Sequence, residues 1–220
     1  MNIKHHLDEA TLLSYSAGSI SQAMALVVAC HLSMCPTCRE RAIQSEAIGG
    51  ALLESMESAP VGDDALAQVL ACIDSDDDIQ VNRMPTASKH SDSDLPRPLA
   101  DCLGVELEQV EWKRIVPGVY YYDLPYKTER VGVSRLLRIA PGKSMLPHSH
   151  DGNELTLILR GSFSDEMGRF TAGDIADLDS EIEHQPLVDS DEDCICLVAT
   201  DAPLKFSTLL GKLVQPMTGF

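Results

Sequence analysis

Residues 29–40, ACHLSMCPTCRE, bring one histidine and three cysteines into a short stretch. Cys35 and Cys38 form a Cys-x-x-Cys pair, and His31 precedes Cys35 by four residues, so His31 and Cys35 can share one face across a helix end. A thioredoxin-like dithiol would need a β-strand directly before the pair, whereas the preceding residues have a helical period. The spacing therefore favours a metal site over a redox pair.

This stretch supplies three ligands, and a tetrahedral zinc ion takes four. A proline follows Cys35 and fits the first position of a new helix, which puts Cys35 near the N-cap and Cys38 in the first turn. The N-terminus of a helix favours the thiolate that a metal needs. His5 and His6, just before the first expected helix, are both candidates for the fourth ligand.

A second set of metal-ligand residues begins in PGKSMLPHSHDGNELTLILRG, residues 141–161. His148 and His150 are two residues apart, so both face the same side of a strand. The turn DGN allows Glu154 to return to that side on the next strand, and His184 further along would complete a set of three histidines and one carboxylate. Nitrogen and oxygen ligands of this kind suit Zn, Mn, Fe or Ni.

The elements that must position these residues fall into two halves. Residues 1–73 predict a small bundle of about four helices, in which Asp8 caps the first helix, Gly18 ends it and Ser19 starts the second. Residues 74–98 are acidic, rich in serine and aspartate and interrupted by prolines, which is typical of a linker.

Residues 99–220 have a different pattern, with short alternating stretches such as VSRLLRIA, NELTLILRGSF, DIADLD and DCICLVAT between Gly, Pro and Asp turns. This spacing predicts an all-β barrel or sandwich, so the fold class is multidomain α plus β. Cys194 and Cys196 share one face of their strand. We expect them to face the core, a vicinal redox pair being the alternative.

Composition limits the partners. The chain has 220 residues, 17 Lys and Arg against 34 Asp and Glu, and a net charge of −17. This charge would repel nucleic-acid phosphates and would suit a basic partner. The simpler interpretation is that the charge only keeps the protein soluble. No apolar run approaches the roughly 20 residues of a membrane span, and the start has no signal-peptide hydrophobic region. We therefore expect a cytoplasmic protein without membrane contact, whose clustered cysteines bind metal rather than form disulfides.

Both motifs resemble known families. The H-x₃-C-x₂-C pattern at 31–38, with an upstream histidine on a short helical domain, resembles the zinc-binding anti-sigma domain, and this resemblance selects His6 over its neighbour. The G-x₅-H-x-H-x₃-E-x₆-G pattern at 142–161 resembles the first cupin motif at every fixed position, whereas the second motif, with His184, is matched more loosely. The whole arrangement, the linker excepted, resembles the ChrR-type anti-sigma factors.

The resemblance implies a regulator and not an enzyme. It implies zinc in the helical domain, a second divalent metal in a cupin jelly roll, and a helical domain that sequesters an extracytoplasmic-function (ECF) sigma factor, one to one. The cupin domain would release the sigma factor in response to singlet oxygen and related oxidative stress, making the protein a negative regulator of transcription. The alternative is a cupin metalloenzyme, an oxygenase or isomerase acting on a small molecule, with the helices as a regulatory attachment.

A helical domain of about 70 residues has a small core and gains from a metal that ties its chain start to a helix junction. It holds more apolar residues than such a core needs, and we expect these to be available to a partner: Leu12, Leu13, Ile20, Met24, Val27 and Val28.

Overall fold

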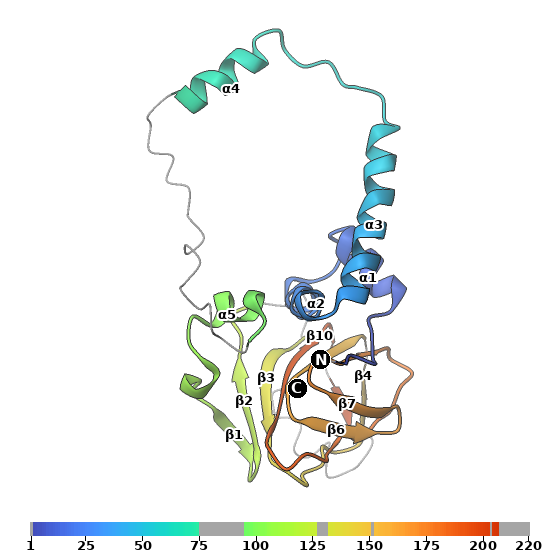
Figure 1. Cartoon of the computed structure of the whole chain (residues 1–220), viewed down its shortest axis with the longest axis vertical. Coiled ribbons are helices and arrows are strands. Elements are labelled where there is room, and N and C mark those ends of the chain that lie inside the picture. Colours follow the sequence, from blue (N-terminus) through green and yellow to red (C-terminus); the bar gives the residue numbers. More distant parts are fainter. Residues whose placement is uncertain (1, 75–94, 127–131, 151, 203, 207–220) are drawn as a thin grey trace.

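The computed structural model describes residues 2–74, 95–126, 132–150, 152–202 and 204–206 (Figure 1). Its helices are α1 (Glu9–Ser16), α2 (Gln22–Met34), α3 (Pro36–Glu54), α4 (Ala65–Asp74) and α5 (Arg97–Leu103), followed by a 3₁₀ turn, η1 (Leu107–Gln109). Most of the expected linker falls outside the described residues. Among the helices described, none has both the length and the apolar character needed to span a membrane.

The helix ends follow local side-chain chemistry. The carboxylate of Asp8 accepts a backbone N–H of the first turn of α1, and Gly18 has the left-handed φ of 66° that the chain reversal after α1 requires. The start of α2 differs from the prediction, because Ser21 and not Ser19 is its N-cap. The hydroxyl of Ser19 instead donates to the carbonyl of Ser14 at the end of α1, so it serves the preceding helix.

The second half is the β fold that the alternating stretches predict. All of its strand pairs are antiparallel, in three sheets ordered β1-β2-β3-β10-β5-β8, β11-β4 and β7-β6-β9. The strands are β1 (Lys113–Val116), β2 (Val119–Asp123), β3 (Ser134–Ile139), β4 (His148–His150), β5 (Glu154–Arg160), β6 (Ser162–Asp165), β7 (Gly168–Thr171), β8 (Ile175–Leu178), β9 (Leu187–Val188), β10 (Cys194–Thr200) and β11 (Leu204–Phe206).

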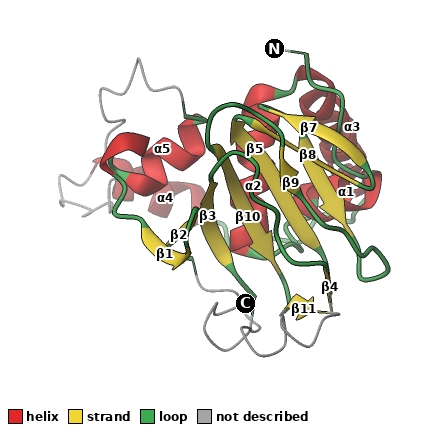
Figure 2. Cartoon of the chain, turned by 90° about the horizontal axis from the view of Figure 1, so that it is seen from below, coloured by secondary structure: helices red, strands yellow, loops and turns green. Residues whose placement is uncertain are grey.

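The two halves share a core, because α2 packs against the outer face of the large sheet. Figure 2 shows β3, β10, β5 and β8 side by side with α2 behind them. Every residue of β10 is buried, and the strand alternates between two cores. One set faces the barrel interior, namely Cys194, Cys196 and Val198. The other belongs to the same cluster as the α2 side chains, namely Ile195, Leu197 and Ala199.

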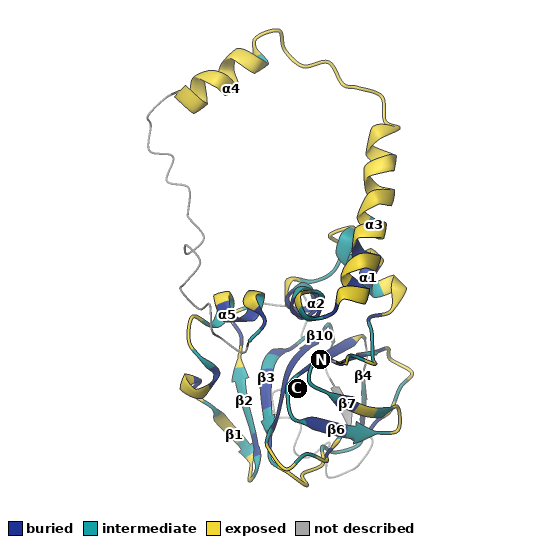
Figure 3. Ribbon diagram, in the orientation of Figure 1, coloured by how far each residue is buried: buried dark blue, intermediate teal, exposed yellow. Residues whose placement is uncertain are grey.

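This shared core corrects the expected partner surface. Four of the six apolar residues expected to be available to a partner are buried, namely Leu12, Met24, Val27 and Val28. Ile20 is half-buried, and only Leu13 is exposed, at 53%. For the four buried residues the expectation is wrong, because it treated the helices as a separate bundle, whereas the barrel sheet covers much of α2. For Leu13 and Ile20 it stays a prediction. Large exposed apolar side chains lie instead on the far half of α3 and on α4. Figure 3 colours most of both segments as exposed.

Two candidate metal centres

The first candidate centre lies where the chain start meets the junction of α2 and α3. His6 precedes α1, His31 lies in the last turn of α2, Cys35 caps α3 and Cys38 is in its first turn, behind Pro36 at the first helical position. One ligand atom from each of the four predicted residues lies within 4.8 Å of the others. Of the two candidates for the fourth ligand, His6 is therefore the one that lies with the other three residues.

Distances within this group fit a tetrahedral ion. The Nδ1 atom of His6 lies 3.3 Å from Cys35 Sγ and 3.5 Å from Cys38 Sγ, which is the separation of neighbouring ligands around one small cation. His31 Nδ1 lies 3.1 Å from the carbonyl oxygen of Gly173, which can only accept, so Nδ1 carries the proton and Nε2 carries a lone pair. That Nε2 is buried and has no hydrogen-bond partner among the described residues, so its lone pair is available to a metal ion.

Burial favours the neutral imidazole of His31, which is the form that binds a metal, but it disfavours the thiolate of Cys38. Burial lowers the pKa of His31 to about 4, so the ring is neutral near pH 7. Burial raises the pKa of the Cys38 thiol to about 11. A thiolate at Cys38 therefore needs a bound cation to hold its charge. The sulfur of Cys35 accepts a long hydrogen bond, 3.5 Å, from the backbone N–H of Cys38.

The second candidate centre lies inside the barrel. His148 opens β4, Glu154 opens β5, and a β-bridge pairs His184 with His148. All three side chains are buried, and one ligand atom of each lies within 4.8 Å of the others. His150 also lies on β4, as the strand spacing predicts, but its side chain falls outside the described residues.

Hydrogen bonds orient these side chains. His184 Nδ1 lies 2.9 Å from Asp165 Oδ2, and His148 Nδ1 lies 2.7 Å from the carbonyl oxygen of Leu146. Both rings therefore direct Nε2 inward, and the two Nε2 atoms are 3.2 Å apart. Thr156 Oγ1 donates to Glu154 Oε1 at 2.9 Å. Partners of this kind fix the tautomer and the orientation of metal-ligating histidines.

The cavity at this centre is small. It has a volume of about 40 Å³, and apart from the three ligands and Thr156 its lining is mostly apolar. Ligand pockets for organic molecules usually measure ~300–1,000 Å³, so this cavity has room for about one or two water-sized molecules.

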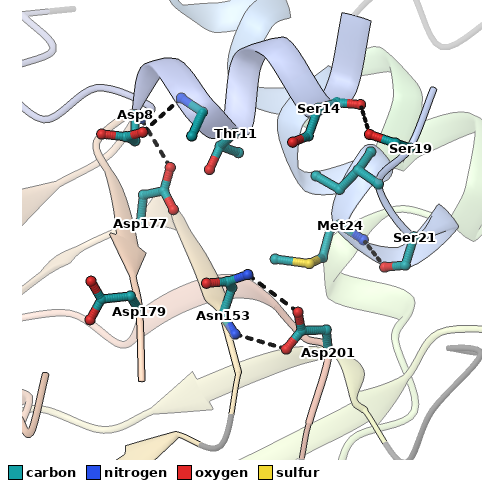
Figure 4. Close-up of a pocket in the computed structure, with 12 residues that line it drawn as sticks. Asp8, Thr11, Ser14, Ser19, Ser21, Met24, Asn153, Asp177, Asp179 and Asp201 are labelled. Atoms are coloured by element: carbon teal, nitrogen blue, oxygen red, sulfur yellow. Dashed lines mark hydrogen bonds between the residues drawn. The ribbon is translucent and has the colours of Figure 1, made fainter. Parts of the chain in front are cut away.

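A larger groove of about 470 Å³ lies where α1 and the start of α2 face the barrel (Figure 4). Carboxylates, hydroxyls and an amide dominate its lining. The backbone N–H of Asp8 donates to Asp177 Oδ2 at 3.0 Å, which joins the two halves. Burial raises the pKa of Asp177, and the carboxylates of Asp8 and Asp179 raise it further. The groove is thus a second region of contact between the halves.

Comparison with known proteins decides the family. A family model described as the ChrR cupin-like domain matches residues 101–203. The anti-sigma-E factor ChrR of Cereibacter sphaeroides is 45% identical over 216 residues, covering 98% of each chain. The chain belongs to the ChrR family of anti-sigma factors. A crystal structure of Rhodobacter sphaeroides SigE in complex with the anti-sigma ChrR matches with a TM-score of 0.76 and 42% identity, covering 91% of this chain and 100% of that one.

Several residues that support the centres of this ChrR-family chain were not predicted from sequence. Asp165 and Thr156 hold ligands of the barrel centre, but no motif marks them, because Asp165 reaches its histidine only through the β6–β7 hairpin. His5 has a different place from its neighbour: its ring stacks on Phe170, with centroids 4.1 Å apart, and its Nε2 lies 3.2 Å from the carbonyl oxygen of Arg169. His5 therefore joins the chain start to the barrel.

Proposed function

We propose that this chain is a cytoplasmic anti-sigma factor that binds an ECF-type sigma factor, one to one, through its helical half. The proposal is supported by the 45% identity to an anti-sigma-E factor and by the 42% identity to a chain solved in complex with SigE. Binding would keep the sigma factor from RNA polymerase, so the protein regulates transcription negatively and catalyses no reaction. Because a sigma factor works on RNA polymerase, both proteins would share a compartment.

The observation that carries this proposal is the apolar surface of α4. Its large apolar side chains follow the i, i+3, i+4, i+7 spacing of one helix face, and all are exposed: Leu66 71%, Val69 57%, Leu70 50% and Ile73 72%. The far half of α3 adds Ile48, Leu52 and Leu53, and Met56 follows just after its C-cap. Such a stripe is the anchor pattern of a helix that lies in a partner's groove.

Charge complements this surface. Residues 1–90 carry five basic and twelve acidic residues, a net charge of −7. An acidic helical half would be attracted to a basic sigma surface, which raises the association rate and makes binding weaker as salt rises.

We propose that zinc occupies the centre formed by His6, His31, Cys35 and Cys38. Two nitrogens and two sulfurs, from three buried residues and the half-buried His6, are the donor set of structural zinc, and the ion would supply the charge that holds two thiolates in place. The barrel centre, made by His148, Glu154, His184 and, in this proposal, His150, has the nitrogen and oxygen donors that suit Zn, Mn, Fe or Ni.

We further propose that the cupin half releases the sigma factor in response to singlet oxygen and related oxidants. The barrel sheet packs on α2, so a change in the barrel can alter how the helical half is held. The alternative, a cupin oxygenase or isomerase, is disfavoured by the cavity of about 40 Å³, which is too small for most organic substrates.

Co-purification of the tagged full chain with its cognate sigma factor tests the proposal. A stable complex of one copy of each chain is expected, with an affinity that falls as salt is raised. Release of the sigma factor on exposure to singlet oxygen should occur in the wild type and be lost when Glu154 is replaced by alanine. A purified chain that binds no sigma factor but turns over a small organic substrate would establish the enzyme instead.

A further inference from the structure

The helical metal centre is in direct contact with the barrel. The backbone N–H groups of Lys4 and His5, just before the ligand His6, donate to Asp174 Oδ1 at 2.6 and 3.0 Å. Asp174 lies in the turn between β7 and β8 and is fully buried. The segment that carries one metal ligand is therefore anchored by a carboxylate of the other half of the protein.

The barrel holds this carboxylate firmly. The second oxygen of Asp174, Oδ2, accepts from the backbone N–H and from the hydroxyl of Thr171, both at 2.8 Å. One oxygen is thus bonded within the barrel turn and the other to the chain start. A buried carboxylate with four donors is charged and rigid, so it fixes the position of the segment that it holds.

The same turn orients a second ligand. The carbonyl oxygen of Gly173 faces His31 Nδ1 at 3.1 Å, and this contact leaves Nε2 as the ligand atom. Gly173 has a φ of 94°, a conformation that other residues rarely adopt, so the direction of its carbonyl depends on glycine. Gly173 consequently bonds one of the four ligands directly, and Asp174 bonds the two residues before another, although all four ligands belong to the helical half.

The hairpin before this turn reaches the other centre. On β7, Phe170 stacks on His5 and also on Phe163 of β6, with the phenyl centroids 4.9 Å apart. Phe163 lines the cavity of the barrel centre, and Asp165 of the same strand holds His184. The β6–β7 hairpin and the turn that follows it thus contact both centres.

From these contacts we propose that Gly173 and Asp174 form the outer shell of the helical metal centre, so that metal binding there and docking of the two halves stabilise one another. Outer-shell partners hold ligands in the geometry that the metal needs, and their loss usually weakens metal affinity about 10- to 100-fold. The linkage is reciprocal: a metal that binds the docked form more tightly favours docking by the same factor. This inference rests on the metal centre proposed above.

Titration of the metal-free full chain with Co²⁺ tests it, because cobalt bound to cysteine gives a thiolate charge-transfer band that the barrel centre, without cysteine ligands, does not give. Asp174→Asn keeps the size of the side chain but removes its charge. It also replaces one accepting oxygen by an NH₂ group, which cannot accept from the two donors that this oxygen bonds. We expect its cobalt affinity at the thiolate centre to fall about 10- to 100-fold. Asp177→Asn is the matched control, because Asp177 lies on β8 and bonds the chain start across the same interface (Figure 4), but at Asp8, two residues past His6, whereas Asp174 bonds the residue next to His6. Its affinity should change by less than about threefold.

Hydrogen exchange supplies the second readout. The N–H groups of Lys4, His5 and Thr171, all bonded to Asp174, should exchange faster after the metal is removed from the wild-type chain. If Asp174→Asn does not fold, Thr171→Val removes one donor without a charge change and should still weaken cobalt binding several-fold. Equal cobalt affinity in the wild type and in a folded Asp174→Asn variant, or exchange unchanged by metal removal, would overturn the linkage. A wild type with no thiolate band would refute the metal centre itself.

Discussion

Truncation of the α4 stripe should weaken sigma binding by an amount set by the exposure of each side chain. Leu→Ala removes about three carbon groups, or ~2.4 kcal/mol for a side chain that becomes fully buried. Leu70 is 50% exposed in the free chain, so a partner can bury about half of its surface, which is worth ~1.2 kcal/mol. Leu70→Ala should therefore raise Kd about 8-fold. Leu66 is 71% exposed, which gives ~1.7 kcal/mol and about 17-fold. The double variant should lose about 100-fold, with some departure from additivity because the two residues are neighbours.

Calorimetry or surface binding with the purified sigma factor measures these constants. Leu187→Ala is the matched control, because Leu187 is 45% exposed, close to Leu70, but lies on β9 of the barrel. It should change Kd by less than about twofold, since surface substitutions away from an interface have little effect. Binding weakened as much by Leu187→Ala as by Leu70→Ala, or a double α4 variant that binds as tightly as the wild type, would show that the α4 stripe is not the interface.

Three further predictions concern the metal centres and the barrel. His31→Ala should lower thermal stability more than His5→Ala, because only the former removes a proposed zinc ligand; equal losses would argue against that zinc. Asp165→Asn should lower the metal affinity of the barrel centre about 10- to 100-fold and leave the cobalt thiolate band unchanged. Loss of that band would contradict the assignment of Asp165 to the barrel centre. Partial burial opposes ionisation of Asp189, but hydroxyl and guanidinium donors lower its pKa to about 2. Its carboxylate should therefore stabilise the fold above the unfolded pKa of about 3.9 and lose that effect as the pH falls toward 2. Melting of Asp189→Asn should differ from the wild type at pH 7 and converge with it in acid, and a pH-independent difference would contradict this.

Sequence signals that span only a few residues predicted the features that neighbouring residues determine, such as helix ends and the spacing of ligands along one helix. The cap at Asp8, the reversal at Gly18 and the helix that starts behind Cys35 follow from residues within one turn of each other. The grouping of His31 with Cys35 and Cys38 follows from helix geometry in the same way. The strands that carry His148 and Glu154 were predicted from alternation and a turn.

Contacts between distant segments were beyond such reasoning. The burial of α2 could not be read from its sequence, because an apolar helix face looks the same whether a sheet or a partner covers it. β10 gave a related ambiguity, since a strand buried on both faces reads as a continuous apolar run. The role of Asp174 depends on a bond across 170 residues to Lys4, which no local pattern marks.

The central claim is that this chain sequesters a sigma factor, and transcription titrated with the purified full chain tests it most directly. RNA polymerase and the cognate sigma factor are held constant while the chain is added. We expect transcription from the sigma-dependent promoter to fall in proportion to the chain added and to end near one chain per sigma factor. Transcription that is unchanged at a many-fold excess of the folded, metal-loaded chain would contradict it.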